Sequence, residues 1–468
     1  MDAPLRGMVP DVVGVASFSS LQKVSAGLEQ ILTALDAPER PLLGLKDRWE
    51  EDFGVDVTHP SLLSLAGVDI HKKVFLVWRS PLGDTQKAPT EHLLSLPVKS
   101  TTQVLGVLTQ MLAESQYVRH VDKEGIVHFS GPPGTALLVS VPSADRLLLW
   151  LRPQDPNAGA ALLANALRHP FSQPFFKAFL RTDVDKSDSV TAANTLVARF
   201  EFAASHAHIL PWSSLLSLPK SGGLRGEWRI VGNAHTIQTI NDFQDDEVKW
   251  QERFVPQALP ISHCVLEKEA LLTLRLPAEA AASLLPGGPS PALTSGLRRE
   301  QERLSGMLSF YIYGRKKFKP TASLMDLSRF VLVGKPKNPQ AASELRTSMT
   351  SGAKTNPRIQ GSYKMLRLAS PQAGRELELV AEADLFAMSF GANGLLAPAL
   401  STESASCALR KPGLLLNGNA ARSQRWHTYQ SPVARLLGQV ANGVLQAEVT
   451  TSIVENALEM NASILFAP

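Results

Sequence analysis

The chain has 468 residues, of which 44% are hydrophobic and 19% are charged, and its net charge is +4. This length implies more than one domain, since domains usually hold roughly 100–200 residues. The composition excludes wholesale disorder and collagen-like or coiled-coil repetition. So small a positive excess does not indicate a nucleic-acid-binding protein.

The first half opens with a strand and a helix. The β-branched run Val12–Phe18 predicts a buried strand. Ser19-Ser20 is expected to cap a helix that ends near Leu35. Further helices are expected at 43–53 and from Ser100-Thr101 onward, and Pro-broken helices at 153–190. Strands are expected at 73–78, 93–98, 125–129, 136–141, 146–151, 195–202, 226–231 and 235–240. Because the strands cluster, the pattern favours α+β with antiparallel sheets over a doubly wound parallel sheet.

The second half repeats this order of elements. A strand at 271–276 corresponds to the opening strand, and a helix at 341–349 corresponds to the one at 103–112. The strands at 308–313, 330–333 and 363–368 stand where 74–78, 93–96 and 126–129 stood. We therefore predict a duplication. The expected fold is α+β, with two tandem related halves at 9–255 and 260–468, each a mainly antiparallel sheet with helices packed on one face.

Sequence motifs give little sign of catalysis. The segment Ser130-Gly131-Pro132-Pro133-Gly134-Thr135 resembles the start of a phosphate-binding loop, but the required Lys-Ser/Thr does not follow, so a structural turn is predicted. The pair His206 and His208 is expected on the surface, and Asp183, Asp185 and Asp188 in a solvated loop. The acidic run that starts at Asp242 is expected to open a helix. We predict no catalytic, cofactor-binding or metal-binding residue.

One dense basic cluster follows a predicted strand that carries two tyrosines. It comprises Arg315, Lys316, Lys317 and Lys319, and the tyrosines are Tyr311 and Tyr313. Basic residues beside aromatic ones can bind RNA, anionic lipid or an acidic protein. The cluster is therefore a candidate interaction patch, and the alternative is a solvated hairpin tip.

Cysteine usage and targeting signals bear on the compartment. The two cysteines, Cys264 and Cys407, are expected to be separate buried thiols rather than a disulfide. No apolar stretch approaches the roughly 20 residues that span a bilayer, and the first residues carry no signal-peptide pattern. The chain is expected to be either cytosolic or a mature segment of an exported protein, and its 32 prolines favour the second.

The first 80 residues resemble a poorly characterised family of bacterial cell-envelope proteins, often lipid-anchored, with repeated α+β modules. The resemblance is carried by the segments Val9-Pro10-Asp11-Val12-Val13-Gly14-Val15, Phe53-Gly54-Val55-Asp56 and Leu65-Ala66-Gly67-Val68-Asp69. It implies a periplasmic or outer-membrane-associated location. It brings no catalytic residue, and the N-terminal Cys of a lipid anchor is absent.

These observations favour a non-enzymatic envelope protein that acts as a scaffold or interaction subunit and presents sheet surfaces or edges to other envelope proteins. Its association with the membrane would be peripheral, or through an anchor that was lost, and nucleic acid is not an expected partner. Two alternatives stay open. One is a hydrolase with a dispersed site between the halves, and the other is a carrier of a lipid or another apolar ligand.

Overall fold

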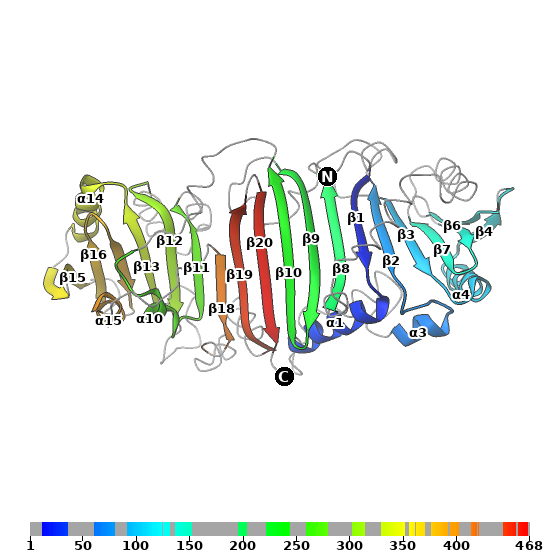
Figure 1. Cartoon of the computed structure of the whole chain (residues 1–468), viewed down its shortest axis with the longest axis horizontal. Helices are drawn as coiled ribbons and strands as arrows, with labels where there is room; N and C mark the ends of the chain where they lie inside the picture. Colours follow the sequence, from blue (N-terminus) through cyan, green and yellow to red (C-terminus); the bar gives the residue numbers. More distant parts are fainter. Residues whose placement is uncertain are drawn as a thin grey trace. The chain divides into compact units, whose positions relative to one another are not determined.

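Antiparallel strands dominate the computed structural model of the chain (Figure 1). The structure describes residues 12–35, 60–79, 91–123, 125–131, 136–151, 195–203, 221–243, 259–278, 302–313, 329–351, 355–360, 362–369, 376–391, 394–401, 413–418, 420, 443–454 and 457–466. The chain divides into two compact units. Unit 1 comprises Met1–Leu32, Leu42–Ile209 and Lys220–Gln244, and unit 2 comprises Thr33–Pro41, Leu210–Pro219 and Asp245–Pro468.

Ten antiparallel strands form the sheet of unit 1 in the order β4-β5-β6-β7-β3-β2-β1-β8-β9-β10. Three helices accompany them: α1 (Leu21–Leu35), α3 (Pro60–Leu65) and α4 (Thr101–Glu114). The strands are β1 (Val12–Phe18), β2 (Val74–Arg79), β3 (Glu91–Pro97), β4 (Val118–Val121), β5 (Val127–Ser130), β6 (Ala136–Ser143), β7 (Arg146–Leu151), β8 (Leu196–Ala203), β9 (Ser221–Val231) and β10 (Ala234–Phe243).

Unit 2 has a sheet of ten strands in the order β14-β15-β16-β17-β13-β12-β11-β18-β19-β20. Its helices are α10 (His263–Glu267), α14 (Pro339–Thr350) and α15 (Leu396–Ser401). The strands are β11 (Leu272–Pro277), β12 (Leu304–Tyr313), β13 (Arg329–Pro336), β14 (Thr355–Gln360), β15 (Tyr363–Ala369), β16 (Glu376–Ala381), β17 (Phe386–Phe390), β18 (Gly413–Asn417), β19 (Val444–Val454) and β20 (Ala457–Phe466).

The two sheets have the same strand order, since each strand of unit 1 has its counterpart ten numbers later in unit 2. The residues that face one another across the strands also correspond. One row of directly opposed residues in unit 1 is Ala16, Leu76, Leu94, Leu149, Val139 and Val127. The matching row in unit 2 is Leu274, Phe310, Leu332, Met388, Leu379 and Leu366. All twelve residues are apolar, so the correspondence extends from topology to register and to side-chain class.

The helices that follow β3 and β13 begin in the same way. The Ser100 hydroxyl accepts a hydrogen bond from the Gln103 N–H at 3.2 Å and caps α4. At α14, the Asn338 side chain accepts one from the Ala341 N–H at 2.7 Å. The cap at Ser100 confirms the helix start predicted from the sequence.

Both faces of the unit 2 sheet are buried. Successive residues of β13 point to opposite faces, and Val331 and Val333 join one apolar cluster while Leu332 joins another. The first cluster includes Leu266 of α10 and Leu396 of α15, and the second includes Leu345 of α14. Helices therefore contact both faces of this sheet. In unit 1, Val104 of α4 packs with Val127, Phe129 and Leu147.

The predicted α+β fold with helices on one face of each sheet is wrong. The described residues form twenty strands and six helices, and α3, α10 and α15 have six residues or fewer. One expected helix position is a strand residue, since Asp242 lies in β10. The cause is physical, since a short apolar or acidic run does not show whether a sheet partner is present, and pairing decides the conformation.

Candidate functional site

The predicted interaction patch does not hold together as an exposed surface. Tyr311 and Tyr313 lie on β12 with no exposed area. The Tyr313 hydroxyl donates to the Leu266 carbonyl oxygen at 2.6 Å, and the Tyr311 hydroxyl contacts His263 Nδ1. Burial raises the pKa of Tyr313 far above its ordinary value. The two tyrosines therefore belong to the core, while Arg315, Lys316, Lys317 and Lys319 lie outside the described residues.

Several other residues singled out in the sequence also lie outside the described residues. They are His206, His208, Asp183, Asp185 and Asp188. The strands on either side of the loop after Ser130 are described, and Ser130 pairs with Ala136 across β5 and β6. The residues 132–135 between these strands lie outside the described residues, so the turn remains a prediction. Within the described part of the chain, no group of three or more His, Cys, Asp or Glu residues is placed to hold a metal ion.

A buried polar group lies beneath α10 in unit 2. Arg275 of β11 forms an ion pair with Glu267 at the end of α10, and these side chains are 10% and 9% exposed. Burial, and secondly the positive charge of Arg275, lower the pKa of His263 to about 4. At neutral pH His263 is therefore uncharged. These contacts attach α10 to β11 and β12.

Glu378 is a second buried charge of unit 2. Its side chain is fully buried in β16, and Arg367 Nη2 on the neighbouring strand lies 3.0 Å from its carboxylate. The backbone N–H of Gly394 also donates to this carboxylate, at 3.3 Å. The sequence analysis missed both buried pairs. The available signal was a charge between apolar residues of a strand, with Arg275 between Leu274 and Leu276 and Glu378 between Leu377 and Leu379.

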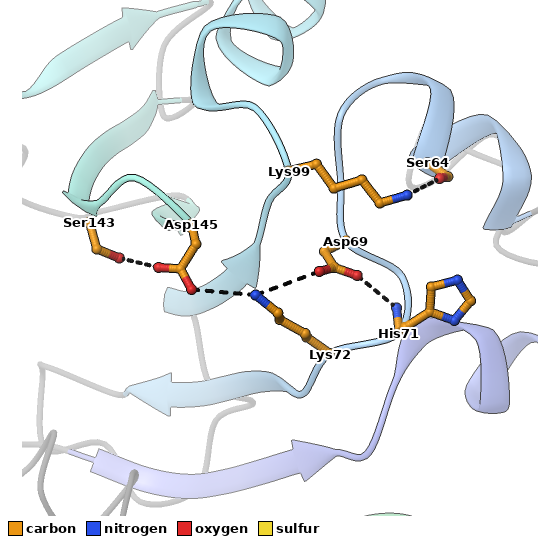
Figure 2. Close-up of polar contacts among 7 residues, drawn as sticks. All are labelled: Ser64, Asp69, His71, Lys72, Lys99, Ser143 and Asp145. Carbon is orange, nitrogen blue, oxygen red and sulfur yellow. Dashed lines mark hydrogen bonds and ion pairs between the residues drawn. The ribbon is translucent and has the colours of Figure 1, made fainter.

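Unit 1 carries an exposed polar cluster where several loops meet (Figure 2). The Lys72 ammonium lies 3.7 Å from Asp69 and 3.5 Å from Asp145. The Lys99 ammonium reaches across to the Ser64 hydroxyl of α3, at 3.0 Å. The cluster comprises Ser64, Asp69, His71, Lys72, Lys99, Ser143 and Asp145.

Hydrogen bonds show what this cluster does. The Ser143 hydroxyl donates to Asp145 at 2.7 Å, and this bond, followed by the charge of Lys72, lowers the pKa of the Asp145 carboxyl. Backbone bonds run beside the side chains, from the Asp69 N–H to the Pro97 oxygen at 2.9 Å and from the Val98 N–H to the Asp145 oxygen at 2.8 Å. Lys72 is 51% exposed and Asp145 60%. The cluster thus fixes loop ends at the surface, where such ion pairs contribute little free energy.

The cysteines differ from the prediction. Cys264 in α10 is disulfide-bonded, and no cysteine of the described residues is free. The other cysteine of the sequence, Cys407, lies outside the described residues. The expectation of two separate thiols is therefore wrong. Positions so far apart in the sequence come together only through the tertiary fold, and no local pattern reports it.

Comparisons with known proteins assign no family to this chain. No family model matches the sequence, and no curated protein matches it. Crystal form I of TP0453 is similar over 53% of this chain and 82% of that chain, at 10% identity and a TM-score of 0.30. Crystal form III gives the same coverage and identity with a TM-score of 0.31. Crystal form IV gives 51% and 83% coverage, 9% identity and a TM-score of 0.28. Likeness at this level supports no functional statement.

The helices of the described residues were also compared with what a bilayer requires. None of them combines the length and the apolar composition of a membrane-spanning helix.

Proposed function

We propose that this protein is a non-enzymatic, extracytoplasmic protein of the bacterial cell envelope that acts as a scaffold or interaction subunit. The disulfide at Cys264 is the observation that carries the location. Disulfides persist in oxidising compartments such as the periplasm and are rare in the cytosol, where thiols are kept reduced. The resemblance of the first 80 residues to envelope proteins points the same way.

The repeated architecture supports the scaffold role. Strand order, register and helix start agree between the units, and this agreement is best explained by duplication of one ten-stranded module. A chain with two copies of a module carries two comparable sets of sheet edges and loops, which suits the joining of other proteins.

The polar groups suit a structural role as well. The buried pairs Arg275–Glu267 and Arg367–Glu378 join neighbouring elements of unit 2. The exposed cluster around Lys72 joins the loop ends of unit 1. The surface contacts differ between the units. At the turn between β16 and β17 of unit 2, Arg346 and Glu382 form an ion pair at 2.9 Å, whereas Asp145 at the turn between β6 and β7 of unit 1 pairs with Lys72. Divergent surfaces on a conserved core fit modules that meet different partners.

Thiol labelling in the organism that makes the protein tests the location. Intact cells are treated with an alkylating reagent, fractionated and probed for the protein under denaturing conditions. An extracytoplasmic protein appears in the envelope or periplasmic fraction with both cysteines protected until a reductant is added. Recovery in the cytosolic fraction with two alkylated thiols would overturn the proposal.

A further inference from the structure

Strand β4 is an exposed edge of the unit 1 sheet. Among the described residues it pairs with β5 alone, and all four of its residues are exposed. Its two valines, Val118 and Val121, are 69% and 44% exposed, although valine is a strand-forming residue that is usually buried. An edge of this kind can accept an additional strand.

The register shows which backbone groups face outward. In an antiparallel pair, alternate residues direct their N–H and C=O toward the partner and away from it. The Asp122 N–H donates inward to the Ile126 oxygen of the β5 side, at 3.0 Å. Even-numbered residues of β4 therefore bond to β5, and the N–H and C=O groups of Arg119 and Val121 point away from the sheet.

The equivalent edge in unit 2 is blocked. Val121 pairs with Val127, Val127 corresponds to Leu366, and Leu366 pairs with Pro357 of β14. Proline therefore stands in β14 where valine stands in β4. A proline has no N–H to offer an incoming strand, and edge prolines prevent such pairing. The two units thus differ at this edge in the outward backbone N–H that an added strand would accept a hydrogen bond from.

Charge indicates what the edge would bind. Among the described residues the Arg119 guanidinium has no ion-pair partner, and the exposed Lys123 lies two residues beyond the end of the strand. If two copies paired antiparallel with Val121 opposite Val121, Arg119 of each copy would lie opposite Lys123 of the other, which is unfavourable. A strand with an acidic residue opposite Arg119 and an apolar one opposite Val121 complements the edge.

We infer that β4 binds, by strand addition, an extended segment of another protein that carries an acidic residue and, two positions along the same face, an apolar residue. The inference rests on the proposed scaffold function and specifies the chemistry of the partner. The partner's backbone pairs with Arg119 and Val121, and its acidic side chains lie beside Arg119.

A binding assay on the purified full chain tests this inference. The probe is a short labelled peptide that repeats glutamate, serine, valine and serine, so that glutamate and valine alternate along one face of the strand. The charge control carries lysine in place of glutamate, and binding is followed by fluorescence anisotropy. The Val121→Pro variant brings in the blocking residue of β14, and its lost N–H serves no bond within the sheet. The matched control, Val121→Ala, keeps the N–H and loses only apolar contact.

The glutamate peptide should bind the wild type and Val121→Ala within about threefold of each other, and Val121→Pro at least about tenfold more weakly. Arg119→Glu should reverse the preference toward the lysine peptide. Equal binding by wild type and Val121→Pro, or absence of binding, overturns the inference. A wild-type dimer that Val121→Pro converts to a monomer overturns it in favour of a second copy. These outcomes are independent of the cell fractionation, which alone tests the compartment.

Discussion

Reduction of the disulfide at Cys264 should destabilise unit 2 and spare unit 1. The two cysteines of the sequence, Cys264 and Cys407, are 143 positions apart (407 − 264), so a bond between them would close a long loop of the unfolded chain. For a loop of this length, the chain-entropy relation gives about 17 cal/mol/K, or about 5 kcal/mol at 25 °C. Because native disulfides commonly contribute somewhat less, we expect a loss of about 2–5 kcal/mol. This loss is a large share of the total stability of a domain.

The assay compares urea unfolding of the wild type with and without dithiothreitol, together with hydrogen exchange resolved by peptide. After reduction, strands of unit 2 such as β11 and β12 should exchange faster by a factor that matches the loss of free energy. Strands of unit 1 such as β2 and β3 should keep their protection. The matched control is the double variant Cys264→Ser with Cys407→Ser, which dithiothreitol should leave unchanged.

Two results would refute this reasoning. One is an unfolding midpoint that is the same with and without reductant. The other is a loss of protection spread equally over both units. Before reduction, the denatured wild type should show no titratable thiol, whereas two titratable thiols would show that the bond is absent.

Three further predictions concern residues of unit 2, and two of them have a control variant in unit 1. Since burial, and then Arg275, lower the pKa of His263 to about 4 while the unfolded value is about 6.5, the unfolded state binds more protons between these values. Stability should therefore be full above pH 6.5 and fall by about 3 kcal/mol as the pH drops to 4, and His263→Asn should flatten this part of a pH series of urea midpoints. Gly413→Ala should lower the free energy of unfolding by at least about 2 kcal/mol, because Gly413 has φ +152° and a Cβ there would lie 1.8 Å from the Val449 oxygen. The control Gly106→Ala in α4, where a Cβ would meet no atom within 4 Å, should raise it by about 0.5–1 kcal/mol in thermal unfolding. Arg367→Ala should cost about 3 kcal/mol, because it leaves the fully buried Glu378 carboxylate without its ion-pair partner. Lys72→Ala, at an exposed pair, should cost less than about 1 kcal/mol in the same measurement.

The sequence by itself determined the positions of many elements. The strands at Val12–Phe18 and Arg146–Leu151 and the helix at Leu21–Leu35 are where the apolar pattern predicts them. In the second half, β11, β12, β13, α14 and β15 lie where the strands at 271–276, 308–313, 330–333 and 363–368 and the helix at 341–349 were predicted. These features are local, because an apolar period, a capping serine or a β-branched run acts within a few residues of the chain.

Only the tertiary structure decided the fold class, the place of the tyrosines and the state of the cysteines. Asp242 is a strand residue because a neighbouring strand pairs with it. Tyr311 and Tyr313 are buried because α10 lies over β12 and supplies partners for their hydroxyls. Cys264 is bonded because the fold joins distant segments, and Arg119 is exposed because the sheet ends at β4. Each of these outcomes depends on contacts between residues far apart in the sequence, which no local pattern records.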